Sequence, residues 1–167
     1  MNLPHKIATL LYCFNAQDEV LLMERAREPN LGLWSPPGGK LVSEFGESPY
    51  ECACREAAEE LALNITPGDL HLLGIISEKG DEGQAHWLMF LFEVRKRVLH
   101  VPARHREGRF AFFNRDAIDQ LKIPRTDREY IWPLVWKYRG GYFAAHCRSG
   151  LHGQDQWLIE ESRLPGD

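Results

Sequence analysis

The chain lacks the long apolar run that a membrane-spanning helix requires. No stretch approaches the ~18 consecutive apolar residues needed to cross a bilayer. The run at residues 7–14 is short, and Asp18 and Glu19 soon follow it, so it predicts a β-strand and not a signal peptide. Internal repeats and low-complexity tracts are also missing. With 44% hydrophobic residues, the 167-residue chain is expected to form one globular domain over 1–167.

Cysteine is scarce and is not arranged for metal or redox chemistry. The four cysteines, which form no C-x-x-C pair, are Cys13, Cys52, Cys54 and Cys147. Cys52 and Cys54 would point to different sides of one helix. We therefore expect reduced, mostly buried thiols in a cytoplasmic protein.

A strong excess of positive charge is absent as well, which argues against a general nucleic-acid coat. The net charge is −4, whereas affinity for nucleic acid depends on many Lys and Arg contacts with phosphates. One local excess occurs between Arg95 and Arg109, where six basic residues accompany a single acid, Glu107. Most of these side chains are expected to be solvated, and a minority to face a polyphosphate.

What the chain does contain is a concentration of acid in the segment ESPYECACREAAEELAL, residues 47–63. Glu56, Glu59 and Glu60 stand at i, i+3 and i+4, which places them on one helical face. Like charges about 6 Å apart repel by roughly 3 kcal/mol at an effective dielectric constant near 20, and such neighbours destabilise a helix. A hard divalent cation reverses that penalty, because Mg²⁺ takes carboxylate oxygens and keeps waters for a phosphate substrate. The alternative is a solvated acidic face.

The residues around these acids favour the metal interpretation. Gly39 precedes the helix, and a glycine backbone can approach a ligand closely. The sequence SPYE at 48–51 predicts a helix start with a capping box. Arg55 can hold a carboxylate bidentately, with Glu47 as a candidate partner. Small and apolar side chains for packing on a sheet are Ala53, Cys54, Ala57, Ala58 and Leu61.

This segment resembles the Nudix box of hydrolases that act on nucleoside diphosphates linked to another group X, a pattern written G-x5-E-x7-R-E-U-x-E-E-x-G-U with U apolar. The matching residues are Gly39, Glu47, Arg55, Glu56, Ala57, Glu59, Glu60 and Leu63. The sequence departs from the pattern twice. Seven residues instead of five separate Gly39 from Glu47, and Ala62 takes the place of the last glycine. Because that glycine normally supplies a left-handed helix end, we expect Asn64 to adopt this conformation and the helix to run slightly longer.

The remaining chain predicts an α/β fold with a mixed sheet. Strands are expected at 6–14, 19–25, 70–78, 86–94, 109–114, 142–147 and 156–161, the first two as one hairpin and the last two as another. A loop is expected at 29–39 and a polar connection at 79–84. Helices are expected at 115–121 and 127–138, with a break or first-turn placement near Pro133. The resemblance implies the same architecture, a Nudix-type α/β/α sandwich with the box as a loop-helix-loop.

The resemblance also implies a reaction, the hydrolysis of a phosphoanhydride bond, with Mg²⁺ as cofactor and Mn²⁺ as an alternative. The metal ligands that it implies are Glu56, Glu59, Glu60 and the Gly39 carbonyl. Arg55 would orient these carboxylates. A carboxylate not saturated by metal would take the proton from the attacking water, and Glu59 and Glu107 are both candidates for this base.

Residues outside the box suggest where a nucleotide would bind. In the MutT-like branch, which acts on 8-oxo-guanine nucleotides, an acidic residue before a helix reads the purine edge. Asp127 occupies the matching position, although it is also a good N-cap. Trp132 or Phe14 would stack nearby, although Trp132 also suits the core. Arg25 is a candidate for a phosphate contact or a surface salt bridge, and Trp34 is expected to pack under the box loop.

Three functions are compatible with these features. The first is a pyrophosphohydrolase that converts a normal or oxidised (d)NTP to a monophosphate and pyrophosphate. The second applies the same chemistry to ADP-ribose, a dinucleoside polyphosphate or a 5′-triphosphate RNA end, which a basic groove at 95–109 would favour. The third is a non-catalytic Nudix module that binds a nucleotide. The expected partner is a small nucleotide, and the chain is expected to be a monomer or homodimer that does not bind membranes.

Overall fold

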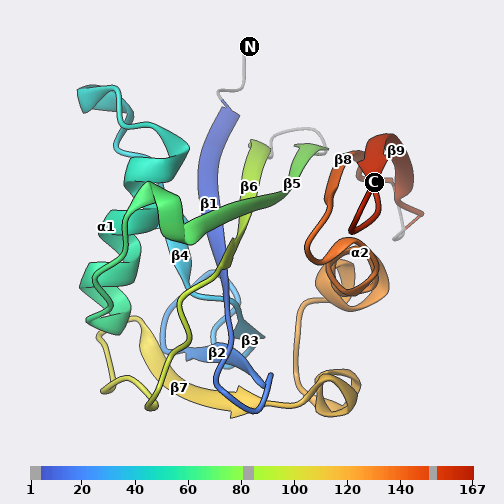
Figure 1. The fold of residues 1–167 in the computed structure, drawn as a ribbon. Helices are drawn as coiled ribbons and strands as arrows, with labels where there is room; N and C mark the ends of the chain where they lie inside the picture. Colours follow the sequence, from blue (N-terminus) through green and yellow to red (C-terminus); the bar gives the residue numbers. More distant parts are fainter. Residues whose placement is uncertain (1–4, 81–84, 151–153) are drawn as a thin grey trace.

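The computed structural model describes residues 5–80, 85–150 and 154–167, and within these ranges the chain forms two β-sheets and two main helices (Figure 1). A six-stranded mixed sheet has the order β4-β1-β6-β5-β8-β9, and a three-stranded sheet has the order β3-β2-β7. The strands are β1 (His5–Cys13), β2 (Val20–Arg25), β3 (Trp34–Ser35), β4 (Gly38–Lys40), β5 (Leu70–Lys79), β6 (His86–Val94), β7 (Gly108–Phe113), β8 (Tyr142–Arg148) and β9 (Gln156–Arg163).

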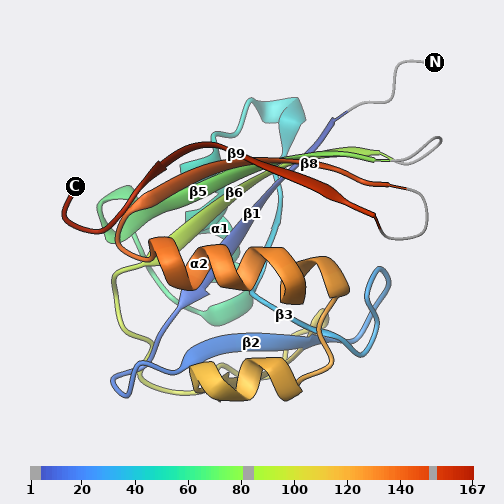
Figure 2. The same ribbon diagram turned by 90° about the vertical axis from the view of Figure 1, so that its right-hand side faces the viewer.

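The helices lie on opposite sides of the larger sheet. Helix α1 (Pro49–Leu61) covers one face and helix α2 (Trp132–Tyr138) the other (Figures 1 and 2). A π-helical turn, η4 (Asp127–Ile131), leads directly into α2. Short 3₁₀ turns are η1 (Ser43–Phe45), η2 (Pro67–Asp69) and η3 (Arg115–Gln120). This arrangement confirms the predicted α/β/α sandwich with a mixed sheet, in which β1 runs parallel to β6, and β5 parallel to β8.

Successive side chains of β1 point to opposite faces of the larger sheet and join two separate hydrophobic core clusters. Leu11 and Cys13 belong to the cluster under α1, whereas Tyr12 belongs to the cluster under α2. From the helices, Ala57 joins the first cluster and Val135 the second, both without exposed surface. Because β1 is buried on both faces, it reads as a continuous apolar run.

The start of α1 is as predicted, but its end is not. The Ser48 hydroxyl accepts the Glu51 N–H at 3.2 Å, and the Glu51 carboxylate accepts the Ser48 N–H at 2.8 Å, which completes the capping box. Ala62 itself takes the left-handed conformation, with φ of 50°, so the helix stops at Leu61 and the expectation for Asn64 was wrong. The immediate reversal lets the Leu63 N–H reach the Ala57 carbonyl and lets Leu63 pack under α1.

The predicted hairpin of the first two strands was also wrong. Strands β1 and β2 lie in different sheets and share a single bridge, between Phe14 and Val20. Both edges of β1 are already occupied, by β4 and β6. The Asn15 side chain accepts the N–H groups of Gln17 and Glu19 and turns the chain out of the sheet. The expected loop at 29–39 contains β3 and the first residues of β4.

The other predicted elements are present. Strands β5 and β6 pair antiparallel, as do β8 and β9. Part of the expected connection at 79–84 lies outside the described residues, as does part of the β8–β9 turn. The expected break near Pro133 takes the form of the π turn, in which the Trp132 N–H bonds to the Asp127 carbonyl. A proline cannot donate to the residue four positions earlier and crowds its carbonyl, which favours a wider turn before Pro133.

The protein shows no helix long and apolar enough to span a membrane in the described part of the chain. All four cysteines are free, and Cys54 is the only one of them that is not buried.

Candidate functional site

A cleft of about 780 Å³ runs between the box helix and the turn before α2. This volume is in the range of small-molecule sites. At one end lie the acids of α1, together with Gly39 of β4 and Glu107 of the loop before β7. At the other end lie Asp127 and residues of β5 and β6. Two groups of acidic side chains therefore line one cleft, the first on α1 and the second formed by Glu78 of β5 and Asp127 of η4.

Arg55 is the centre of the first cluster. Its Nε donates to Glu47 Oε1 at 2.7 Å, and its Nη1 donates to Glu56 Oε1 at 2.7 Å and to Glu59 Oε2 at 3.3 Å. Its Nη2 adds a second bond to Glu47 and one to the Lys40 carbonyl. These bonds hold the pKa of Glu47 below its usual range and raise that of Arg55. Arg55 thus fixes the orientation of three carboxylates at once.

Glu56 and Glu60 face inward, whereas Glu59 is exposed. Glu56 is 9% exposed and Glu60 is 7% exposed, so these two acids do not belong to a solvated acidic face. Removal from water raises the pKa of Glu60 to about 7, and the neighbouring Glu56 charge adds to the rise. Burial also raises the pKa of Glu56, although Arg55 opposes the shift. The Gly38 N–H donates to Glu60 Oε2 at 3.0 Å.

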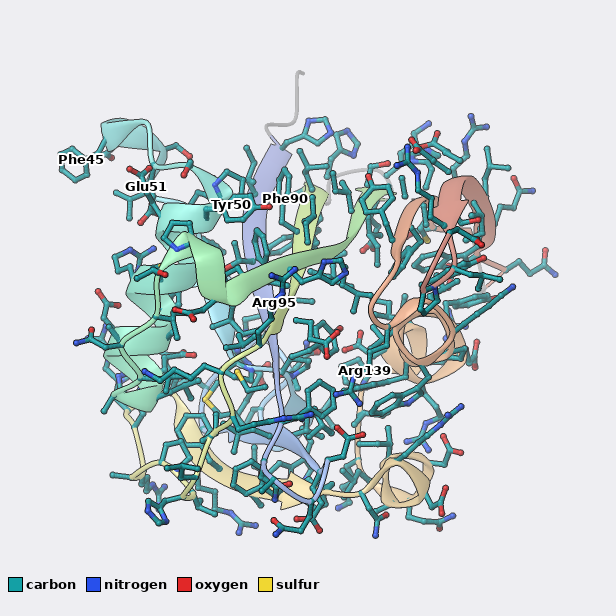
Figure 3. The ribbon with its side chains drawn as sticks, in the orientation of Figure 1. Phe45, Tyr50, Glu51, Phe90, Arg95 and Arg139 are labelled. Atoms are coloured by element: carbon teal, nitrogen blue, oxygen red, sulfur yellow. The ribbon has the colours of Figure 1, made fainter. Side chains whose placement is uncertain are left out.

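Gly39 lies directly against the Glu56 carboxylate. A Cβ atom at this position would come within 2.1 Å of Glu56 Oε1, so only glycine allows this approach. The two additional residues between Gly39 and Glu47 are absorbed by the turn η1 and by Gly46, whose φ is 65°. The Val42 N–H closes this loop on Glu47 at 2.7 Å. Phe45 of the same turn projects away from the body of the protein (Figure 3).

The chemistry of this cluster fits a hard divalent cation. Glu56 and Glu60 are both buried, the Glu56 charge helps to raise the pKa of Glu60, and the Gly39 backbone borders the Glu56 carboxylate. Oxygen donors of this kind are those that Mg²⁺ and Mn²⁺ prefer. As the side chains stand in the described residues, no three carboxylates, histidines or cysteines already converge on one point. Among the carboxylates bonded to Arg55, Glu59 has the longest contact, 3.3 Å, and its side chain is 53% exposed.

Arg25, Arg106 and Glu107 complete this end of the cleft. Arg25 Nε donates to the Pro29 carbonyl at 2.7 Å, and Arg106 lies 3.8 Å from Glu107. The charge of Glu107 contributes to the raised pKa of Glu60, and the charge of Arg25 opposes it. Among the basic residues of 95–109, Arg106 lines the cleft, whereas Arg97 and Arg109 form ion pairs with Asp18 and Glu24.

The second cluster contains residues that the sequence interpretation missed. Glu78 lies near Asp127, and burial followed by the Glu78 charge raises the pKa of Asp127 to about 7. Trp87 and Met89 of β6 line the same stretch of cleft, and Lys40 lies 5.8 Å from the centre of the Trp87 ring. A signal for these residues exists in the sequence, because alternation puts Ile76 and Glu78 on one face of β5.

Phe14 and Trp132 are not among the residues that line the cleft. Phe14 is 1% exposed, and the Arg139 guanidinium covers its ring at 3.6 Å. Arg139 reaches inward from the end of α2 (Figure 3). Trp132 is 3% exposed and packs against Tyr12 and Trp136. These rings serve the core, so the expectation that either one stacks near a base is not supported.

Trp34 packs edge-on against Phe113 at 4.8 Å, with Arg109 over its ring. It does not line the cleft, as expected of a residue that supports the loop.

The fold and the acidic helix together define the class of Nudix-fold proteins. The family model for the NUDIX domain matches residues 4–132, and the chain belongs to this family.

Several known proteins are similar to the chain. The mouse (Mus musculus) protein described as 8-oxo-dGDP phosphatase NUDT18 is 36% identical over 81 residues, which are 48% of this chain and 22% of that protein. The chain thus matches less than a quarter of the length of this relative. The MutT protein of Bacillus halodurans superimposes with a TM-score of 0.73 at 23% identity, over 93% of this chain and 97% of that one. The NUDIX domain of Shewanella oneidensis NrtR, solved with ADP-ribose, gives a TM-score of 0.60 at 17% identity, over 81% and 88%.

Proposed function

We propose that the chain is a divalent-metal-dependent hydrolase of a phosphoanhydride bond in a nucleoside diphosphate linked to another group. The observation that carries this proposal is the Arg55 network. Arg55 is anchored on Glu47 and bonds to Glu56 and Glu59, which line a cleft of nucleotide size together with Gly39. A surface ion-pair network would not need two buried acids or a glycine in contact with one of them.

Each residue at this end of the cleft has a separate proposed role. Glu56, Glu59, Glu60 and the Gly39 carbonyl would hold Mg²⁺ or Mn²⁺, which when bound neutralises phosphate charge and acidifies a coordinated water. Arg55 keeps the carboxylates aimed at the cleft. Glu59 or Glu107 accepts the proton of the attacking water, since both face the cleft. Arg25 is placed to meet the phosphate chain.

The base end of the cleft favours a nucleotide with N–H donors on its base. Asp127 and Glu78 offer carboxyl groups there, and Trp87 and Met89 offer apolar surface. We therefore place a normal or oxidised purine (d)NTP first, with a monophosphate and pyrophosphate as products. The name of the mouse relative, an 8-oxo-dGDP phosphatase, supports an oxidised guanine nucleotide, and ADP-ribose in the NrtR domain supports the second candidate. The free cysteines support a reducing, cytoplasmic location.

A substrate panel tests this proposal. The protein is incubated with dGTP, 8-oxo-dGTP, 8-oxo-dGDP, ADP-ribose and diadenosine polyphosphates, with Mg²⁺ or with chelator, and the products are separated by chromatography. Metal-dependent release of pyrophosphate from a purine triphosphate is the expected result. Turnover of ADP-ribose alone would support the second candidate function, hydrolysis of ADP-ribose. Binding of these compounds without turnover would support a non-catalytic nucleotide-binding module.

A further inference from the structure

We propose that the C-terminal hairpin, β8–β9, positions the acidic base end of the cleft through an ion pair between Arg125 and Asp155. This inference rests on the proposed function, because it concerns how the same cleft holds a nucleotide. Arg125 and Asp155 are positioning residues and lie outside the set that lines the cleft.

The turn that carries Asp127 departs from regular α-helical geometry. Asp127 opens the π turn, in which its carbonyl is bonded five residues ahead, to the Trp132 N–H, instead of four. Such turns are uncommon and are frequent at functional sites. Side chains from outside the helix also hold this turn.

Two of these contacts come from the C-terminal hairpin, one from Asp155 just before β9 and one from Trp157 in β9. Arg125 Nη2 lies 2.5 Å from Asp155 Oδ2, and Arg125 Nη1 lies 2.6 Å from Glu129 Oε2. The Asp155 side chain is only 7% exposed, whereas Glu129 is exposed, so the buried partner belongs to the hairpin. Two residues beyond Asp155, Trp157 stacks on Tyr130 with ring centres 4.9 Å apart and an angle of 16°. The hairpin thus contacts Arg125, two positions before Asp127, and Tyr130 of the π turn itself.

The same hairpin also contacts the second acid. The Ser149 hydroxyl donates to Glu78 Oε1 at 3.3 Å, and β8 pairs with β5 in parallel along 74–79. Arg128 anchors the turn on its other side by donating to the Asp119 and Leu121 carbonyls. One hairpin therefore sets the separation of Glu78 and Asp127.

The hairpin lies beyond the part of the chain that matches the family model, which ends at residue 132. The Arg125–Asp155 contact joins a residue inside that part to one outside it. The hairpin thus helps to shape a site whose proposed metal ligands all lie between residues 39 and 60.

A double-mutant cycle tests the proposal. The variants are Arg125→Ala, Asp155→Ala, the double variant, and Asp155→Asn as the conservative replacement that keeps an acceptor oxygen. KM and kcat are measured with 8-oxo-dGTP, and binding of dGMP and of pyrophosphate is measured by calorimetry. Glu161→Ala is the matched control, because Glu161 is on β9 and forms an exposed ion pair, 3.1 Å from Arg163, and neither residue lines the cleft.

Each single variant is expected to raise KM roughly five- to twentyfold with kcat within about twofold, and the double variant should match either single one. Binding of dGMP should weaken in parallel while pyrophosphate binding stays unchanged, and Asp155→Asn should lie between wild type and Asp155→Ala. An unchanged KM, a loss confined to kcat, or additive effects would overturn the proposal. So would equal weakening of dGMP and pyrophosphate binding.

Two further outcomes separate this inference from the function. If the wild type turns over no nucleotide, the proposed function fails, and dGMP binding alone then decides the inference. A wild type that does not bind dGMP overturns it. If Asp155→Ala does not fold, Arg125→Lys replaces it, since Arg125 is half-exposed and lysine lacks the planar fork whose two Nη groups bond to Asp155 and Glu129. An unchanged KM in that variant also overturns the inference.

Discussion

At the scale of single residues, Arg55 reduces the charge repulsion between the acids of α1 and holds them in one orientation. Glu56, Glu59 and Glu60 repel one another, and Arg55 gives two of them a common partner. Glu60 has no such partner and is buried, which is why its pKa rises to about 7. A cation would relieve a charge that the protein alone leaves uncompensated.

Replacing Arg55 should therefore impair catalysis by disordering the carboxylates that it orients. Arg55→Ala is expected to lower kcat about 10- to 100-fold at saturating Mg²⁺, because the carboxylates lose their common orientation. Arg55→Lys should recover part of the loss, since it keeps the charge but not the fork. Arg163→Ala, which breaks an exposed ion pair on β9, is the control. Wild-type turnover in Arg55→Ala would show that the orienting role is wrong.

Asp127 should make stability depend on pH in a defined window. Its pKa is about 7 in the folded protein and near 3.9 when unfolded, so the folded state prefers the protonated form. The stability that protonated Asp127 contributes is fully present below pH 4 and is lost as the pH rises through 7. Between pH 5 and pH 8 the free energy of unfolding should fall by about 2 kcal/mol more in wild type than in Asp127→Asn.

Urea unfolding at the two pH values measures this difference. Asp116→Asn, an exposed carboxylate in η3, is the control and should show the wild-type pH dependence. Equal pH dependence in wild type and Asp127→Asn would mean that Asp127 is ionised in the folded state throughout this range.

At the scale of elements, local signals predicted α1 well at its start and poorly at its end. The Ser48 and Glu51 side chains act on neighbouring backbone groups, so their effect can be read from four residues. Ala62 adopts a left-handed conformation because Leu61 and Leu63 both pack under the helix, and that packing depends on distant strands. Propensity alone favoured Asn64 for this conformation.

The end of α1 offers a direct test. Ala62→Gly should raise the free energy of unfolding by about 0.5–1 kcal/mol, because glycine has no Cβ penalty at a φ of 50°. Ala58→Gly, at an exposed position in the middle of the same helix, should lower it by a similar amount. Thermal or urea unfolding compares the two variants. Loss of stability in Ala62→Gly would contradict the left-handed assignment.

At the scale of the whole molecule, periodicity identified most strands but not their partners. The partners of β1 are β4, which is only three residues long, and β6, about eighty residues later in the chain. Neither can be inferred from the apolar run at 7–14. The acids of the box were predictable because their spacing is local. The burial of Glu60 was not predictable, because the residues that surround it come from segments distant in the sequence. Phe14 was misassigned because an aromatic residue at a strand end serves equally well as core.

The most direct test of the central claim is a Mg²⁺ titration of nucleotide hydrolysis by wild type and Glu60→Gln. Glutamine keeps the shape of the side chain and an acceptor for the Gly38 N–H, so the unfolding midpoint should not fall. We expect no wild-type turnover in chelator, recovery with added Mg²⁺, and a loss of roughly 100-fold or more in kcat for Glu60→Gln. Turnover that persists without metal, or a Glu60→Gln protein with full Mg²⁺-dependent activity, would contradict the claim that these acids bind the catalytic ion.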